Sequence, residues 1–359
     1  MKILYITHGY APNVGGVEYV VKSIAERLAK KGHDVIVLAG SRSNNVEEQV
    51  INGVRVIRWP VFSPGEAYHI PKRVNKFTEL VKRIAKNADV IHFQNVHSVF
   101  PVYALRVLKD ISAKKVFTLH YHGTGHTLFR RTLWLAWRSF VKKTIKECDI
   151  IHAVSKYEAK IIEKHFKFKP IVIIENGVEE WITNFNWTPQ NYAMYSGKIA
   201  KYKNVHRFAR IISILNKEYN YELELKIYGD GPYRAALEKH LRKLQIKYHL
   251  KYHLNPYQPY DKYIETLSKA MLFGQLSERE AFSIVTNEAN AIGVPVVVAE
   301  PWGLNFAERP RTLIVSLSLS DYHIAKKVAS FLENIKSQPK PNVKTWNEII
   351  DKYMHELYA

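Results

Sequence analysis

The feature that most constrains this chain is a regular alternation of short apolar segments with longer segments of helical periodicity. It begins with the apolar run Lys2–Thr7, a loop ending in Gly15-Gly16, a helical pattern over Val17–Lys31 and a second apolar run, Val35–Ala39. A strand, a helix and a strand in this order form a parallel sheet covered by helices. We therefore expect an α/β fold built from doubly wound parallel sheets.

The alternation runs through the chain twice, with a break between the two series. Further strands are expected at 89–94, 115–120, 149–155 and 171–175, and then at 192–197, 222–228 and 296–299. Residues 181–190 show no clear periodicity and are interpreted as a linker. A chain of 359 residues is long enough for two domains. We expect the first domain to span 1–185 and the second to span 191–340.

The charge balance narrows the classes of partner. The chain has 53 Lys and Arg against 33 Asp and Glu, a net charge of +20, which favours a nucleic acid, an anionic membrane or a phosphorylated substrate. No zinc-finger, KH or RRM signature accompanies this charge, so nucleic acid is not expected. The single cysteine, Cys148, excludes an internal disulfide and a cysteine-based zinc site. With no signal peptide and no 18-residue apolar run, we expect a cytoplasmic protein, soluble or peripheral to the membrane.

Polar groups gather where the strands of the first series end. Gly15-Gly16 stands just before a helix and allows a ligand to approach the backbone closely, although such a turn is as often structural. Five histidines, at 92, 97, 120, 122 and 126, surround two strand ends. They allow either a metal site or a polar cleft facing a sugar, with His120 at its strand tip. The cleft is favoured because no pair has the i, i+4 helical spacing of a metal motif.

A segment of the second series carries two carboxylates eight positions apart. Ser283–Ile292 is predicted to be a helix that Gly293 ends, so Glu280 lies in the preceding loop and Glu288 about two turns inside. A helix N-terminus presents unpaired N–H groups and a partial positive charge to a phosphate. Carboxylates at these two positions could accept hydrogen bonds from a sugar and a ribose. The structural alternative is that Glu280 caps the helix and Glu288 is a solvated surface residue.

Three further features carry charge or shape. The loop 198–204 after a predicted strand contains three lysines, among them Lys198 and Lys203, and Gly229 opens a sharp turn after another strand. The segment Phe129–Glu147 is amphipathic, with aromatic and aliphatic residues on one face and basic residues on the other. Such a helix can dock on an anionic membrane or pack its apolar face in a domain core, and both alternatives remain open.

Taken in order, these motifs resemble the retaining glycosyltransferases of family four, which have the GT-B fold of two Rossmann-like domains facing across a cleft. The matching segments are Gly15–Glu18, Asp89–His92, Thr118–His120, Ala153–Ser155, Glu175–Val178, Ser196–Lys198, Lys203-Asn204, Gly229–Pro232, Glu280–Glu288 and Gly293–Val297. The resemblance covers residues 3 to about 299. It also implies that residues 341–359 form a helix that crosses back to the N-terminal domain.

The resemblance implies a role for each matching residue. Glu288 would hold the ribose of a nucleotide sugar, and Glu280 a hydroxyl of the transferred sugar. Backbone N–H groups of Ala281, Phe282 and Ser283 would line that sugar, and those of Ile284 and Val285 would meet the diphosphate. Lys198 and Lys203 would neutralise the phosphates, Gly15, Gly16 and Gly229 would belong to the donor site, and His120 would lie over the reaction centre.

The implied chemistry is hexosyl transfer with retention, without a metal or other cofactor, because fixed cations and helix N–H groups stabilise the departing diphosphate. UDP is the favoured donor base and GDP the alternative. The expected acceptor is a glycan or a polyprenyl-phosphate-linked precursor at the cytoplasmic face of the membrane. The family usually has Arg where this chain has Lys198, and Gly where it has Ser283. These departures bear on which sugar is transferred. Alternatives are a sugar-nucleotide epimerase of the same architecture and a non-catalytic polyanion-binding protein.

Overall fold

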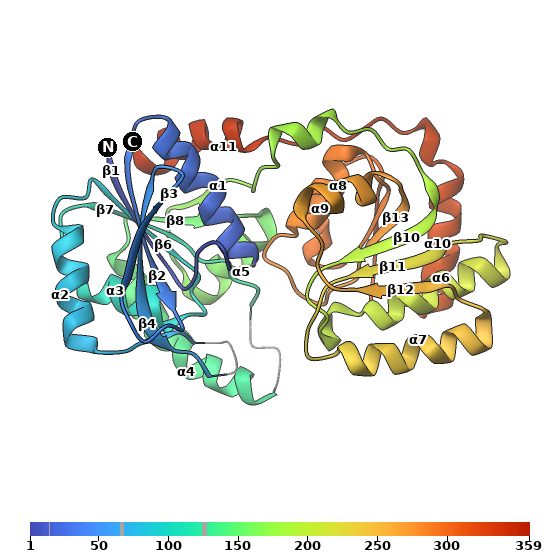
Figure 1. The fold of residues 1–359 in the computed structure, drawn as a ribbon, viewed down its shortest axis with the longest axis horizontal. Coiled ribbons are helices and arrows are strands. Elements are labelled where there is room, and N and C mark those ends of the chain that lie inside the picture. The colour runs from blue at the N-terminus through green and yellow to red at the C-terminus, as the bar shows by residue number, and fades with distance from the viewer. Residues whose placement is uncertain (14, 65–67, 124–127) are drawn as a thin grey trace. The chain divides into compact units, whose positions relative to one another are not determined.

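The computed structural model describes residues 1–13, 15–64, 68–123 and 128–359, apart from the side chains of 128–131. The chain forms two compact units, which are described separately (Figure 1). Unit 1 comprises Met1–Asn176 together with Trp346–Ala359, and unit 2 comprises Gly177–Thr345. Each unit has its own sheet, so the expected mixed α/β fold with two domains is confirmed.

Within the described residues of unit 1, nine strands form one sheet in the order β3-β4-β2-β1-β6-β7-β8-β9, with β5 paired to β4. Their bounds are β1 (Lys2–Thr7), β2 (Asp34–Ser41), β3 (Glu47–Ile51), β4 (Val54–Phe62), β5 (Ile70–Pro71), β6 (Val90–Gln94), β7 (Lys114–Thr118), β8 (Ile150–Ala153) and β9 (Ile171–Ile173). All are parallel except β3 and β5, which run antiparallel to β4. The strand order reverses between β1 and β6, which makes their carboxyl ends the expected ligand-binding edge.

Helices cover both faces of this sheet. They are α1 (Gly16–Lys30), α2 (Val74–Ala85), α3 (Val99–Val107), α4 (Leu128–Thr144), α5 (Lys156–Phe166) and α11 (Trp346–Lys352), which a wider helical turn, Tyr353–Tyr358, follows. On one face α11 packs against α1, where Arg27 Nε donates to Asn347 Oδ1 at 3.1 Å (Figure 1). On the other face α2, α3 and α4 enclose a core that includes Leu4, Phe77 and Phe117. The last 14 residues are thus an integral part of unit 1.

The amphipathic segment at 129–147 forms α4 and the short turn after it. Trp134, Val141 and Ile145 are buried in the core of unit 1, and Trp137 is half-buried with its Nε1 donating to Val96 O at 3.0 Å. Most of the apolar face therefore packs against the domain, as the core alternative holds, although Leu133 is 43% exposed. The buried side chains are not available to enter a membrane.

The sheet of unit 2 has six parallel strands in the order β12-β11-β10-β13-β14-β15. The strands are β10 (Gln190–Ser196), β11 (Glu224–Tyr228), β12 (Tyr252–Asn255), β13 (Ala270–Gln275), β14 (Val296–Ala299) and β15 (Thr312–Val315). The order reverses between β10 and β13, as in a dinucleotide-binding sheet. Val178 and Ile182 are buried in the core of this unit, so the stretch expected to be a linker packs onto unit 2.

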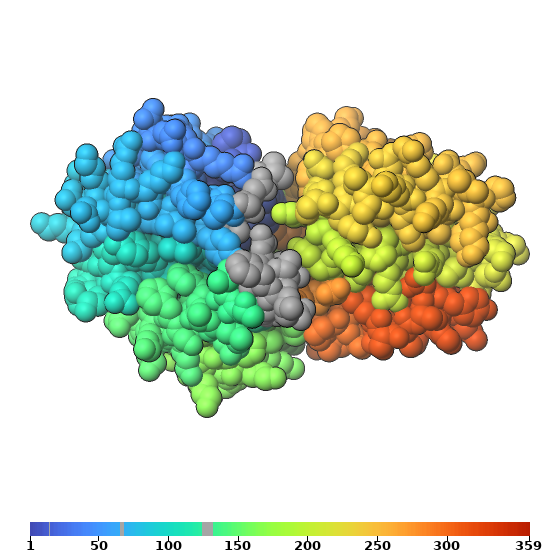
Figure 2. All heavy atoms as spheres, turned by 90° about the horizontal axis from the view of Figure 1, so that it is seen from below, coloured from blue at the N-terminus to red at the C-terminus, as the bar shows by residue number. Residues whose placement is uncertain are grey.

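The helices of unit 2 also lie on both faces of its sheet. They are α6 (Val205–Glu218), α7 (Arg234–Tyr248), α8 (Tyr260–Ser268), α9 (Ile284–Ile292) and α10 (Asp321–Glu333). On one face α6 lies between α7 and α10, as the surface view also shows (Figure 2). On the other face α8 packs beside α9. The reversal point and α9 belong to the same edge of the sheet, and that edge carries most of the predicted site residues.

Candidate active site

The loop after β10 and the loop after β13 are joined at the reversal point of unit 2. Asn204 Nδ2 donates to Leu276 O at 3.0 Å, and the Glu278 N–H donates to Tyr202 O at 2.9 Å. Lys203 lies in the first loop and Glu280 in the second. These two hydrogen bonds hold Lys203 and Glu280 near each other although they are 77 positions apart in sequence.

Lys203 and Glu280 form an ion pair that is largely shielded from solvent. The Nζ of Lys203 contacts Oε1 of Glu280, and their side chains are 13% and 17% exposed. Burial alone would lower the pKa of Lys203, but the attraction of Glu280 outweighs it and the pKa is raised. Lys203 therefore remains a fixed cation at neutral pH. The capping alternative for Glu280 is wrong, because Ser283 is the residue that caps α9.

The N-terminus of α9 faces the same edge of the sheet. The Ser283 side chain accepts a hydrogen bond from the Thr286 N–H, while the helix supplies no partner for the N–H groups of Ile284 and Val285. Phe282 packs on Phe306 with ring centroids 5.4 Å apart. The helix end thus offers fixed donors and a partial positive charge to an anion.

Glu288 lies inside α9 and is almost completely buried, with 2% of its surface exposed. Tyr260 donates to its Oε1 at 2.6 Å, and Tyr263 donates to its Oε2 at 2.9 Å. Burial raises the pKa of Glu288 to about 7, more than the two tyrosine hydroxyls lower it. The surface alternative for Glu288 is therefore wrong. The two tyrosines, one turn apart on α8, are site residues that the sequence analysis did not identify.

Lys198 and Gly229, two further predicted site residues, lie in the loops that follow β10 and β11. Lys198 follows Gly197 and is exposed, and its backbone carbonyl accepts a hydrogen bond from the Tyr195 hydroxyl at 2.9 Å. Gly229 lies against the same turn, since a Cβ atom there would be 2.0 Å from Gly197 O. Only glycine fits at position 229, which lets the ends of β10 and β11 meet beside the lysine loop.

The loop after β14 contributes to the same region. Trp302 is completely buried, and its Nε1 donates to Ser277 O at 2.7 Å. Phe306, four residues later, is the partner of Phe282. The two aromatic residues of this loop support the chain on either side of Glu280.

In unit 1 the corresponding edge holds a small polar cluster. Asn95 Nδ2 donates to His8 Nδ1 at 3.1 Å, which leaves His8 Nε2 as the donor to Glu18 Oε1 at 3.3 Å. Burial raises the pKa of Glu18, but the hydrogen bond from His8 opposes it and the pKa is lowered overall. A Cβ atom at Gly15 would lie 2.2 Å from a Glu18 oxygen. Gly15 is thus required for this contact, and Gly16 is the first residue of α1.

His120 follows β7 in a left-handed backbone conformation, with φ of 50°. Its Nε2 lies 2.8 Å from Gln94 Oε1 and donates to it, so Nδ1 carries the lone pair. Burial, together with His152 and His8, lowers the pKa of His120 to about 3. The imidazole is neutral at physiological pH. The Nε2 of Gln94 is buried beside it and has no hydrogen-bond partner among the described residues.

The remaining histidines of the first series serve other roles. His97 and His122 stack with centroids 4.2 Å apart, and His92 belongs to a buried hydrogen-bond chain. His126 lies outside the described residues. Within the described ranges, no group of three His, Cys, Asp or Glu side chains is placed to hold a metal ion.

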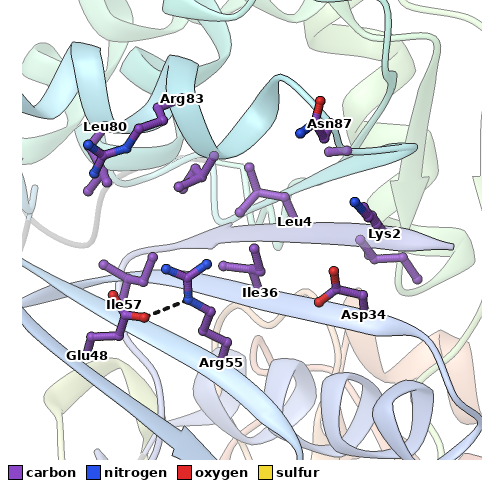
Figure 3. A pocket seen from close by; sticks show the side chains of 13 residues that line it. Lys2, Leu4, Asp34, Ile36, Glu48, Arg55, Ile57, Leu80, Arg83 and Asn87 are labelled. Atoms are coloured by element: carbon purple, nitrogen blue, oxygen red, sulfur yellow. Dashed lines mark hydrogen bonds and ion pairs between the residues drawn. The ribbon is translucent and has the colours of Figure 1, made fainter.

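A separate cavity of about 360 Å³ lies in unit 1 between α2 and the amino-terminal parts of β1 and β2 (Figure 3). Lys2, Asp34 and Arg83 are among the residues that line it, and Arg55 within it is paired with Glu48 at 2.7 Å. It lies away from the carboxyl ends of the strands, where the glycine loop and His120 are found. It is therefore not the candidate active site.

Two family models match the chain in succession. The model described as Glycosyltransferase Family 4 matches residues 14–180, and the model described as Glycosyl transferases group 1 matches residues 178–345. N-acetyl-alpha-D-glucosaminyl L-malate synthase of Bacillus anthracis is 24% identical over 318 residues, covering 82% of this chain and 78% of that protein. A phosphatidylinositol N-acetylglucosaminyltransferase subunit of Homo sapiens is 22% identical, and the match covers 98% of this chain and 72% of that protein.

Solved structures share the fold at lower identity. Sucrose-phosphate synthase of Thermosynechococcus elongatus superposes with a TM-score of 0.76 at 17% identity, covering 99% of this chain and 98% of that one. Anabaena HepE in complex with UDP and glucose gives a TM-score of 0.71 at 15% identity and covers 100% of both chains.

Proposed function

The chain belongs to family 4 of the glycosyltransferases and has their GT-B fold, and from this premise we propose that it moves a sugar from a nucleotide-diphosphate donor to a lipid-linked acceptor with retention of configuration. The observation that carries the proposal is the ion pair between Lys203 and Glu280 in front of the α9 N-terminus. It supports the proposal because a cation and a carboxylate that could bind a sugar lie together at the edge where this type of sheet binds nucleotides.

The donor would use the groups of this edge in sequence. Glu288 would accept the ribose hydroxyls, since each carboxylate oxygen has a second lone pair beside its tyrosine bond. The N–H groups of Ile284 and Val285 would bind the diphosphate. Those of Ala281, Phe282 and Ser283 would line the sugar, with Glu280 on one of its hydroxyls.

The lysines would act as the bond to the leaving group breaks. Negative charge grows on the diphosphate in the transition state, and a cation already in place stabilises it without rearrangement. Lys203 is held by Glu280, whereas Lys198 is exposed and can turn towards the phosphates when the donor binds. This field would make the reaction independent of a metal.

In unit 1, Gly16 and His120 both lie at the carboxyl edge of the sheet. Because Nε2 of the neutral His120 donates to Gln94, its Nδ1 can accept a hydrogen bond from a sugar hydroxyl. A retaining reaction by double displacement would need a carboxylate nucleophile, and none is assigned. We therefore favour attack from the side of the leaving diphosphate, whose oxygen accepts the acceptor's proton.

The donor base and the acceptor are supported by the relatives. HepE was solved with UDP and glucose, so UDP is the favoured base and GDP the alternative. The name of the human relative includes phosphatidylinositol, and that of the Bacillus relative includes L-malate. The net charge of +20 favours the lipid class, at the cytoplasmic face of a membrane with anionic lipid. No helix within the described residues is long and apolar enough to cross a membrane.

Thermal-shift screening against UDP-, GDP- and ADP-sugars tests the donor half of this proposal. A ligand at a hundred times its dissociation constant stabilises the folded protein by about 2.7 kcal/mol. We expect a UDP-sugar to raise the melting temperature of the wild type and to act more weakly on Glu288→Ala. No stabilisation by any nucleotide sugar would contradict the proposed function.

A further inference from the structure

We propose that unit 1 docks on an anionic lipid bilayer through one surface, the β5–α2 surface, formed by Phe62, Ile70, Val74, Arg73 and Lys76. The inference rests on the proposed function, because a lipid-linked acceptor would be reached from such a docked position. It assigns the membrane contact to a different part of unit 1 from α4, most of whose apolar face lies in the core.

The β5–α2 surface exposes large apolar side chains that the fold does not cover. Phe62 is 58% exposed, Ile70 is 40% exposed and Val74 is 43% exposed. Phe62 and Ile70 are direct cross-strand partners in the short β4–β5 pair, and Val74 opens α2 four positions later. Single exposed apolar residues are ordinary, but three at one strand connection form a patch.

Hydrogen bonds and ring contacts anchor the chain beside the patch. The Lys72 N–H donates to Pro60 O at 2.9 Å, and Trp59 Nε1 donates to Lys72 O at 2.8 Å. Phe77, one turn into α2, packs on Trp59 and on Phe100 with centroids 5.5 and 4.8 Å apart. These contacts hold β5 and the start of α2 against the core while Phe62 and Ile70 face solvent.

Basic residues surround the patch and continue along α2. Arg73 and Lys76 are exposed next to Val74, and Lys82, Arg83 and Lys86 are exposed further along the helix. Glu79 is the exposed acid between them. The buried residues of α2 are all apolar, among them Phe77, Leu80 and Val81. Its solvent side is thus strongly cationic beside an apolar tip, a combination complementary to an anionic bilayer rather than to a neutral one.

The docking surface is connected to the candidate site of the same unit. His69 immediately precedes Ile70, and its ring packs against His8 with centroids 4.9 Å apart. His8 in turn contacts Glu18 beside the glycine loop. The Val99 N–H donates to Tyr68 O at 2.7 Å, which fixes this connection to α3. A bilayer bound at Ile70 would therefore lie close to the edge that carries Gly16.

Co-sedimentation with vesicles tests the proposal, using phosphatidylcholine alone and phosphatidylcholine with 30% phosphatidylglycerol. Three variants of the full chain are compared with the wild type. The apolar variant carries Phe62→Ser and Val74→Ser, and the charge variant carries Lys76→Glu and Arg83→Glu. The matched control carries Ile246→Ser and Lys243→Glu on α7 of unit 2, where Ile246 is 80% exposed.

We expect the wild type and the α7 control to bind the anionic vesicles and to bind neutral ones weakly. Each basic residue near an anionic surface strengthens binding of the protein to the vesicle roughly fivefold. The charge variant should therefore bind the anionic vesicles at least tenfold more weakly than the wild type. The apolar variant should lose a similar factor. Patch variants that bind like the wild type, an equal loss in the α7 control, or a wild type that ignores anionic vesicles would each overturn the proposal.

Donor binding is measured on the same samples to separate the two proposals. Patch variants should keep the stabilisation by nucleotide sugar, because none of the substituted residues belongs to the donor site. Donor binding without vesicle binding would refute the docking surface alone. Vesicle binding without any donor binding would refute the proposed function and leave the docking surface supported. A dimer that is lost in the patch variants, without vesicle binding, would assign the surface to a second copy and overturn the proposal.

Discussion

The Tyr358 hydroxyl donates a hydrogen bond to His92 Nδ1 over 2.7 Å. The donor and acceptor roles follow from a chain of hydrogen bonds that ends at Ile174 O. Ile174 O can only accept, so His152 Nε2 carries a proton and its Nδ1 accepts from Thr118. Thr118 therefore accepts from His92 Nε2, which leaves His92 Nδ1 as an acceptor. Both histidines are neutral, and the final turn of the chain is fixed to the sheet of unit 1.

Tyr358→Phe should destabilise unit 1. The variant keeps the ring and removes the donor, so His92 Nδ1 is left buried without its partner. We expect the free energy of unfolding to fall by roughly 1–3 kcal/mol, measured by urea denaturation. Tyr322→Phe, at a half-exposed position on α10, serves as control. Equal stability of the two variants would refute the bond chain.

The same chain predicts a pH dependence. Burial lowers the pKa of His152 to about 4, so the neutral form is favoured in the folded state. This contribution is complete above the unfolded pKa of about 6.5 and is lost as the pH falls towards 4, roughly 3 kcal/mol in all. Burial raises the pKa of Glu158 to about 8. The contribution of this carboxyl to stability therefore changes with pH in the opposite direction.

A comparison of wild type with His152→Gln isolates the histidine, because Glu158 is present in both proteins. The difference between their unfolding free energies, measured at several pH values, should shrink as the pH falls from 6.5 to 4. A difference that is constant over this range would show that His152 does not titrate as described.

The alternation in sequence predicted nine of the parallel strands, but it did not identify the parallel strands β4, β12, β13 and β15. The helix expected at Ser283–Ile292 is confirmed as α9, with Ser283 as N-cap and Gly293 ending it in a left-handed conformation. Strand β3 escaped prediction because this antiparallel edge strand is almost entirely exposed and shows no apolar alternation. Strand β5 has two residues, one of them proline, and gives no periodic signal.

The candidate site was harder to predict from sequence than the fold, because its residues are brought together by tertiary contacts. The glutamates could be found from their spacing on one helix, but the burial of Glu288 results from Tyr260 and Tyr263, which lie 28 and 25 positions earlier. Two tyrosines at helical spacing are typical of ordinary packing, so nothing local identifies them. The pairing of His120 with Gln94 likewise arises because β6 and β7 are neighbours in the sheet.

Glu288→Ala should weaken donor binding about tenfold to a hundredfold, since a hydrogen bond to a buried carboxylate contributes roughly 1.5–3 kcal/mol. Isothermal titration with the nucleotide sugar found by screening measures the effect. Glu265→Ala is the control, because Glu265 lies on α8 but pairs with Lys269 at the surface. Wild-type affinity in a folded Glu288→Ala protein would remove this residue from the donor site.

Donor affinity should also depend on pH through Glu288. Its pKa of about 7 means that the carboxylate is protonated as the pH falls below neutrality and loses acceptor capacity for the ribose. We expect the dissociation constant to rise between pH 8 and pH 6 in the wild type and to change less in Glu288→Ala. An equal pH dependence in both proteins would assign the titration to another group.

Lys203→Ala and Lys198→Ala should lower turnover at saturating donor more than they weaken donor binding, because the charge on the leaving diphosphate is largest in the transition state. Lys203→Ala also leaves Glu280 without its buried partner, so it should lower stability, whereas the exposed Lys198 should not. Steady-state kinetics and thermal denaturation distinguish these effects. Wild-type turnover in both variants would refute the phosphate-binding role.

Activity should persist in EDTA, since the two lysines and the α9 N-terminus provide the positive charge. Turnover is compared before and after chelation, and again after adding magnesium or manganese. Complete loss on chelation, restored by either metal, would show that the reaction requires a metal.

The most direct measurement uses a radiolabelled sugar on the nucleotide that stabilises the protein, supplied with membrane lipid extract. We expect the wild type to transfer label into the lipid fraction with release of nucleoside diphosphate, and Glu280→Gln to transfer far less while remaining folded. Label that stays on the nucleotide, or transfer that Glu280→Gln and Lys203→Ala both leave unchanged, would contradict a sugar transferase acting at the α9 edge of unit 2.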